Sequence, residues 1–151
     1  MIGPIVWWSP PPPLPSNGPL FRAVKSATTQ AGSTGGGEVV FDDEVILSDA
    51  FAANRFTVPV ELNGYYILFT AGVETDNFEQ HNLALEVSTN GGGAWSELVL
   101  DGDYLNQGLT LTSGPILAST GDIYRINYTL IVGASSMVNS DLTFFSGYVL
   151  L

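Results

Sequence analysis

The sequence predicts an all-β domain, and three observations support this prediction. From Leu20 onward Val, Ile, Thr, Tyr and Phe dominate the chain, and these residues favour strands. Glycine and Asn-Gly pairs recur between the apolar runs, where turns are needed. No segment shows apolar residues at the 3.6-residue period of an amphipathic helix. Many short strands joined by turns are typical of a sandwich or a barrel.

The apolar runs define nine candidate strands, each bounded by glycine, proline or polar residues. They span residues 21–27, 38–47, 55–59, 65–73, 82–89, 95–100, 109–112, 123–132 and 142–150. Between them, the glycine-rich segments 32–37 and 90–93 are predicted to be flexible loops. No internal repeat occurs at a fixed period, which argues against a solenoid.

Length and composition limit the class of protein. The 151 residues suit one domain, and 45% of them are apolar, which excludes disorder for the bulk of the chain. Only 13% are charged, too few for a long coiled coil. Because no run of about 18 apolar residues occurs, no membrane-spanning helix is predicted.

The charge balance excludes two kinds of partner. Fifteen acidic residues outnumber four basic ones, which gives a net charge of −11. The four bases are Arg22, Lys25, Arg55 and Arg125, and they do not form a cluster in the sequence. We therefore expect no nucleic acid partner and no anionic membrane partner.

The chain lacks cysteine, so it has no disulfide, thiolate nucleophile or zinc–thiolate site. Its first ten residues carry no base, and their apolar run stops at Pro10. This pattern does not fit a signal peptide, so synthesis in a cytoplasm without cleaved export is expected.

Residues 1–19 are predicted to form an extended arm, and residues 20–151 a head domain. The arm holds seven of the nine prolines, which favours polyproline II. Five apolar residues are predicted to anchor it on another protein: Ile5, Val6, Trp7, Trp8 and Leu14. Two alternatives stay open: the arm folds back on its own head, or its PxxP spacing binds an SH3-type domain. No base flanks that motif before Arg22, which disfavours the second.

Two predicted strands are apolar on both faces. In the segment 65–73, Tyr65, Ile67 and Phe69 alternate with Tyr66 and Leu68. The segment 142–151 repeats this pattern with phenylalanine, tyrosine, valine and leucine. A sandwich strand has one core face, so the second apolar face needs another cover, and association with copies of the same chain is the simplest.

At these strands the chain resembles the globular head domain of complement component one q, a relative of the tumour necrosis factor jelly roll. The motifs that carry the resemblance are FRA at 21–23, VFDD at 40–43, NRFTVPV at 54–60 with NGYYILF at 63–69, GDIYRI at 121–126, and LTFFSGYVLL at 142–151. They occur in the family's order and cover residues 20–151.

The resemblance implies a ten-stranded antiparallel jelly-roll sandwich that forms a homotrimer. Five aromatic residues are expected at the trimer interface: Tyr66, Tyr124, Tyr128, Phe145 and Tyr148. A proline-rich arm stands where the animal members often carry a collagen stalk. This departure favours a structural protein of a virus particle, such as a phage capsid decoration, cement or head-fibre protein located in the virion. Its partners would be itself and, through the arm, a major capsid or other virion protein.

The alternative function is a trimeric head that recognises a receptor or a glycan, as on a tail fibre. Trp95 follows a glycine-rich loop, where it can stack on a sugar or pack in the core. Neighbouring genes, or the position of the protein on a particle, would distinguish the two functions.

No enzyme and no cofactor are predicted. His81 is the only histidine, and its neighbours Glu79, Gln80 and Asn82 suggest a surface loop. The weak metal candidates are Asp101 and Asp103, which flank Gly102, but a solvated turn is the favoured interpretation; the same holds for the acidic segment 76–79. The glycine-rich loops lack the Lys-Ser/Thr pair of a phosphate site.

Overall fold

The computed structural model describes Gly3, residues 18–138 and residues 140–151, with the backbone alone at Gly18 and at residues 103–106. Within these residues the chain forms antiparallel strands, as the sequence predicted. The described part has twelve strands where ten were expected, and it also has one short 3-10 helix. The elements are β1 (Gly18–Lys25), β2 (Gln30–Ala31), β3 (Gly37–Glu38), β4 (Asp43–Ile46), β5 (Phe51–Ala52), β6 (Arg55–Thr57), η1 (Val60–Leu62), β7 (Tyr66–Ser88), β8 (Ser96–Thr112), β9 (Ile116–Leu117), β10 (Ile123–Leu130), β11 (Ser136–Met137) and β12 (Ser140–Leu150). The described part of the chain has no helix of the length and hydropathy that a membrane span requires.

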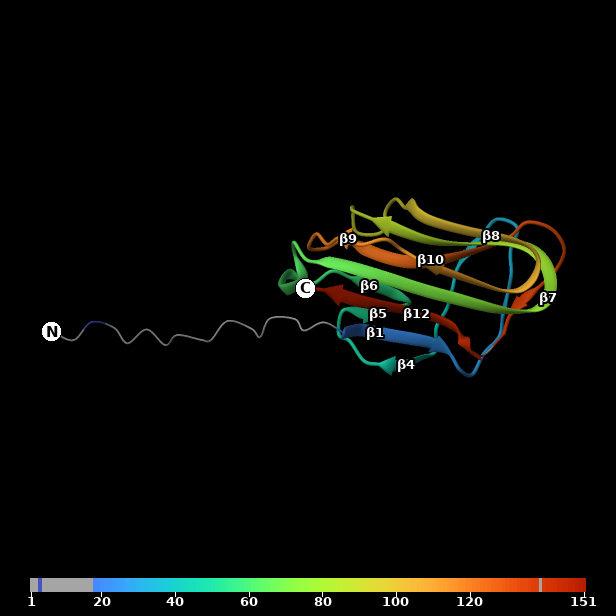
Figure 1. Cartoon of the computed structure of the whole chain (residues 1–151), viewed down its shortest axis with the longest axis horizontal. Helices are drawn as coiled ribbons and strands as arrows, with labels where there is room; N and C mark the ends of the chain where they lie inside the picture. Colours follow the sequence, from blue (N-terminus) through green and yellow to red (C-terminus); the bar gives the residue numbers. More distant parts are fainter. Residues whose placement is uncertain (1–2, 4–17, 139) are drawn as a thin grey trace.

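Two long strands, β7 and β8, connect the two layers of the molecule (Figure 1). The first part of β7 pairs with β12, and its second part pairs with β10, while β8 follows β7 along both parts. The register between β7 and β8 shifts between Glu74 and Glu79 and again between Glu79 and His81. Both strands bend at this place. The sheet is thereby folded onto itself and encloses the core.

This continuity corrects several predicted boundaries. The segments 65–73 and 82–89 belong to one strand, β7, and the segments 95–100 and 109–112 belong to β8. The polar segment 76–79, expected to be a loop, is the bend of β7, and Asp101 lies within β8 rather than in a turn. The polar residues of segment 76–79 therefore mark a bend within β7, and Asp101 belongs to an edge strand, β8. Neither marks the end of a strand.

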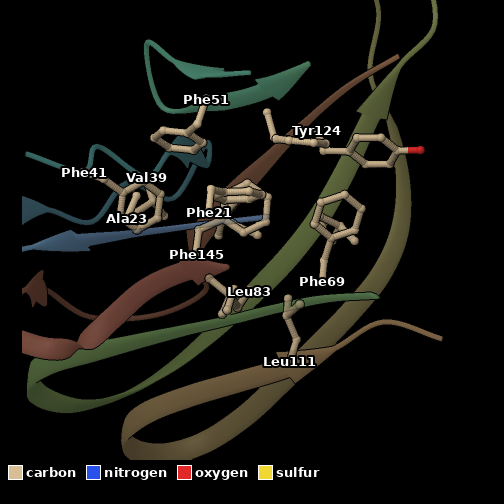
Figure 2. Close-up of a cluster of buried hydrophobic side chains, with 14 of the residues drawn as sticks. Phe21, Ala23, Val39, Phe41, Phe51, Phe69, Leu83, Leu111, Tyr124 and Phe145 are labelled. Carbon is tan, nitrogen blue, oxygen red and sulfur yellow. The ribbon is translucent and has the colours of Figure 1, made fainter. Parts of the chain in front are cut away.

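Aromatic rings from both layers meet in the core (Figure 2). Phe21 of β1 stacks on Phe51 and Phe56, with ring centroids 5.0 and 4.9 Å apart. Phe69 of β7 contacts Tyr124 of β10 at 4.6 Å, which joins the two layers. Each such pair stabilises the fold by about 0.5–1.5 kcal/mol beyond the area that it buries.

The start of β1 and the end of β12 lie at one end of the head, where Gly18 pairs with Val149 (Figure 1). The loops around β2 and β11 lie at the opposite end, beside the bend of β7. The head therefore has a terminal end and a loop end, which differ in the chemistry that they expose.

Candidate interaction surface

One side of the sheet formed by β12, β7 and β9 exposes apolar side chains to solvent. Tyr66 and Leu68 point away from the core, because Ile67 and Phe69, which alternate with them, are buried. Cross-strand pairing adds three residues on the same side. On β12, Leu150 lies opposite Tyr66 and Tyr148 lies opposite Leu68. On β9, Leu117 also pairs with Tyr66, from the other neighbouring strand. We call these five residues, Tyr66, Leu68, Leu117, Tyr148 and Leu150, the outer face.

The outer face is open in the single chain. Tyr66 is 50% exposed, Leu117 54% and Leu150 39%. Further along β12 on the same side, Leu142 and Phe144 border a hollow of about 220 Å³, which Val73 and Leu109 also line. Large side chains at this exposure form a contiguous apolar area of the kind that marks association surfaces.

The structure separates the five residues predicted at the trimer interface. Tyr66 and Tyr148 lie on the outer face, but Tyr124, Tyr128 and Phe145 are buried inside the chain with at most 2% exposure. The alternation along β10 and β12 places these three on the core side, where no second chain reaches them. Desolvation, and secondarily the charge of Asp122, raises the pKa of Tyr124 to about 12.

His81 is not on a surface loop, which corrects the prediction. It lies in β7 at 0% exposure, and its Nδ1 atom is 3.1 Å from the Tyr128 hydroxyl. The alternation of His81, Leu83 and Leu85 on the core side of β7 was the signal that could have placed it.

Trp95 belongs to a charged cluster on the surface of the layer that contains β10 and the second part of β7. The guanidinium carbon of Arg125 is 3.9 Å from its ring centroid, and that of Arg55 is 5.0 Å away. Ion pairs hold both arginines: Arg125 with Glu86 and Arg55 with Glu38, each at 2.7 Å. Trp95 is half-buried, so it is neither a core residue nor an open platform for a sugar.

The predicted metal pair, Asp101 and Asp103, stays a prediction. Asp101 lies opposite Leu83 on β8, and the side chain of Asp103 lies outside the described residues. No group of three or more His, Asp or Glu among the described residues has the arrangement of a metal site. The predicted anchor residues Ile5, Val6, Trp7, Trp8 and Leu14 also lie outside them.

A polar hollow of about 560 Å³ opens at the loop end of the head. Gly32, Ser33 and Ser136 are among its lining residues, with Asp76 from the bend of β7. The Asp76 carboxylate accepts hydrogen bonds from the Ser136 amide at 2.7 Å and the Ser135 hydroxyl at 3.1 Å. These bonds, the backbone one first, lower the pKa of Asp76, so the hollow holds a fixed negative charge.

Comparison with known proteins identifies the fold. No family model and no curated protein matches the sequence. Among solved structures, murine APRIL at pH 5.0 superposes with a TM-score of 0.63 at 16% identity, covering 90% of this chain and 100% of that one. The Eiger TNF of S. frugiperda gives 0.62 at 9% identity, covering 88% and 93%. A second murine APRIL structure, at pH 8.5, gives 0.60 at 18% identity, covering 88% and 98%. At these identities the likeness concerns the fold alone: the chain has a TNF-like jelly-roll fold.

Proposed function

We propose that the chain is a non-enzymatic structural protein whose heads associate into a homotrimer through the outer face. The exposure of Tyr66, Leu117 and Leu150 on one side of the sheet carries this proposal. Covering a large apolar side chain contributes about 1.5–3 kcal/mol, so a few such residues on each copy supply a stable interface.

Three copies are favoured over two by the resemblance of the motifs and by the TNF-like fold. In a closed ring of three, each copy presents two different surfaces, one to each neighbour. The outer face would be the first of these surfaces.

A structural role in a virus particle, as a capsid decoration or head-fibre protein, fits the two parts of the sequence. The head is strongly acidic, which keeps it soluble, whereas residues 1–19 carry no charged side chain and include two tryptophans. The proposed partner of this arm is a major capsid or other virion protein. The burial of His81 agrees with a non-enzymatic role, because a fully enclosed imidazole is not placed to contact a substrate.

The test is sedimentation of the full chain beside two aspartate variants. We expect the wild type to be a trimer at micromolar concentration, and Tyr66→Asp to be a folded monomer, because the new charge would be buried in the interface. Leu47→Asp is the matched control, since Leu47 is 79% exposed and lies off the outer face, so it should remain trimeric. A wild-type monomer at micromolar concentration would refute the proposal.

The alternative is a recognition head that binds a receptor or a glycan, and the polar hollow at the loop end favours it. Its backbone, hydroxyl and carboxylate groups suit a polar ligand, and it opens opposite the end where β1 starts. Electron microscopy of a purified particle distinguishes the two functions. A position on the capsid shell supports the structural role, and a position at a fibre tip supports recognition.

A further inference from the structure

Arg22 lies on the same side of the sheet as the outer face. It pairs with Ser146 across β1 and β12, and Ser146 alternates with Tyr148 on that side. The guanidinium carbon of Arg22 is 4.2 Å from the ring centroid of Phe144. Its nitrogens donate to the Ser146 hydroxyl at 3.2 Å and to the Asp141 carbonyl at 3.1 Å. A half-buried arginine is thus held flat against the sheet by three contacts.

All of these contacts are with neutral groups, unlike those of the other two arginines. Arg55 and Arg125 each bind a carboxylate directly, at 2.7 Å. Lys25 is buried, and although desolvation lowers its pKa, the charge of Asp42 opposes this. Among the described residues no carboxylate lies within 4.0 Å of Arg22, in a chain with a net charge of −11.

Self-association through the outer face would remove water from the surroundings of this charge. Desolvation of an unpaired guanidinium is strongly unfavourable, and it is offset only when an anion enters with the covering surface. Arginine has five N–H donors in a planar fork, and the described contacts engage two of its nitrogens. The remaining donors suit a carboxylate, which arginine binds in a bidentate geometry.

We propose that a carboxylate of a neighbouring copy pairs with Arg22 across the self-association interface. A second copy is the occupant that the charges favour, because each chain carries fifteen acidic residues. The pair would fix the register of the copies, since the apolar contacts alone are not directional. This inference rests on the proposed self-association and adds the interaction that orients it.

The first test measures the dissociation constant of the assembly by sedimentation equilibrium in 50 mM and 500 mM NaCl. Arg22→Gln should weaken association about tenfold at low salt, the effect of losing one charge-assisted pair, and should remove most of the salt dependence seen in the wild type. Arg22→Lys should fall between the two, because it keeps the charge but not the fork. Arg55→Gln, which removes a charge from the other layer, should associate as the wild type does.

The second test identifies the partner group with a carbodiimide, which joins an amine to a nearby carboxylate as an amide with loss of water. In Arg22→Lys the new amine should couple to an acidic residue of another copy, and mass spectrometry of mixed light and heavy isotope chains shows that the link is between chains. Lys25 is the internal blank, because it is 1% exposed.

The outcomes separate the two proposals. If the wild type trimerises with the same affinity and salt dependence as Arg22→Gln, and Arg22→Lys gives no cross-link between chains, this inference alone is overturned. A monomeric wild type overturns the proposed self-association and this inference with it. Weakened association together with the cross-link supports both.

Discussion

The imidazole of His81 and the phenol of Tyr128 form a buried polar pair between β7 and β10. Their hydrogen-bonding atoms are 3.1 Å apart, and their rings meet edge to face with centroids 5.6 Å apart. Desolvation raises the pKa of Tyr128; a hydrogen bond with Ser135 opposes this rise, and the nearby charges of Asp76 and Glu79 add to it. The phenol therefore stays neutral and is available as a hydrogen-bonding partner in the interior.

Removal of this pair should destabilise the head. His81→Ala leaves a cavity and removes one hydrogen-bonding partner of the Tyr128 hydroxyl, so we expect the free energy of unfolding to fall by about 2–4 kcal/mol in urea denaturation at fixed protein concentration. Tyr128→Phe removes only the hydroxyl and should cost about 1–3 kcal/mol. Wild-type stability in His81→Ala would show that the imidazole is not part of the core.

Asp42 stabilises the turn after β1, at residues 26–28, by hydrogen bonding. Its carboxylate accepts hydrogen bonds from the backbone amides of Ser26, Ala27 and Thr28 and from the Ser26 and Thr28 hydroxyls. Desolvation alone would raise the pKa of Asp42, but these hydrogen bonds outweigh it and hold the pKa far below its usual range.

Asp42→Asn should lower the free energy of unfolding by about 1–2 kcal/mol at pH 7, as the loss of a capping carboxylate does. The folded-state pKa lies below the unfolded value of about 3.9, so the stabilisation is complete above about pH 4 and is lost as the pH falls through the folded pKa. The difference between wild type and variant should therefore be constant above about pH 4 and narrow as the pH is lowered from about 4 to 2 in urea titrations. Asp43→Asn is the matched control, because its carboxylate accepts none of the hydrogen bonds that Asp42 accepts, and it should change the free energy of unfolding by less than about 0.5 kcal/mol at pH 7.

The contact between Arg125 and Trp95 should be measurable as a coupling. A double-mutant cycle of Arg125→Gln and Trp95→Ala should give about 0.5–1 kcal/mol of interaction free energy, the usual value for a partly exposed cation–π contact. A cycle of Trp95→Ala with Arg22→Gln, an arginine in contact with Phe144 instead, should give none. Equal couplings in both cycles would mean that the effect is not local to the cluster.

The fold class was predictable because strand alternation is a local property. The two-sided pattern of Tyr66, Leu68 and Phe69 predicted a strand with an exposed apolar side, and the structure has that side open. The prediction of the interface residues rests on aromatic character and on the family resemblance rather than on the face of the strand. Tyr124 and Phe145 therefore proved to be core residues, although the period-2 pattern of their own strands already separated core from surface.

Long-range geometry was not accessible from composition. The slip in register that bends β7 near Glu79 depends on its pairing with β8. The cluster around Trp95 likewise depends on the pairing of β10 with β7, which places Arg125 opposite Glu86. Such contacts join segments far apart in the chain, so local patterns do not encode them.

Gly147 of β12 leaves room for the ring of Phe21, its partner on β1. A Cβ atom there would lie 2.6 Å from Cε1 of Phe21, whose ring is stacked on Phe51 and Phe56 and has no room to move. Gly147→Ala should lower the free energy of unfolding by about 1–3 kcal/mol in urea. Gly114→Ala is the matched control, because no atom lies within 4 Å of its added Cβ, and it should change stability by less than about 0.5 kcal/mol.

The arm, rather than the head, should attach the protein to its partner. Two of the three tryptophans lie at positions 7 and 8, and large aromatic residues usually dominate the binding free energy of an interface. Prolines restrict the unbound arm, so less entropy is lost on docking, and three arms on one trimer bind with increased avidity. Because residues 1–19 carry no charged side chain, attachment should change little with salt.

The measurement is incorporation into host particles, or pull-down of a partner, after deletion of residues 2–15. The shortened chain should fold and trimerise, because the strands of the head begin at Gly18, but it should lose attachment. Trp7→Ala with Trp8→Ala should reproduce most of that loss, whereas Trp95→Ala, in the only tryptophan of the head, should not. If the shortened trimer attaches as well as the full chain, the anchor lies in the head and this prediction is wrong.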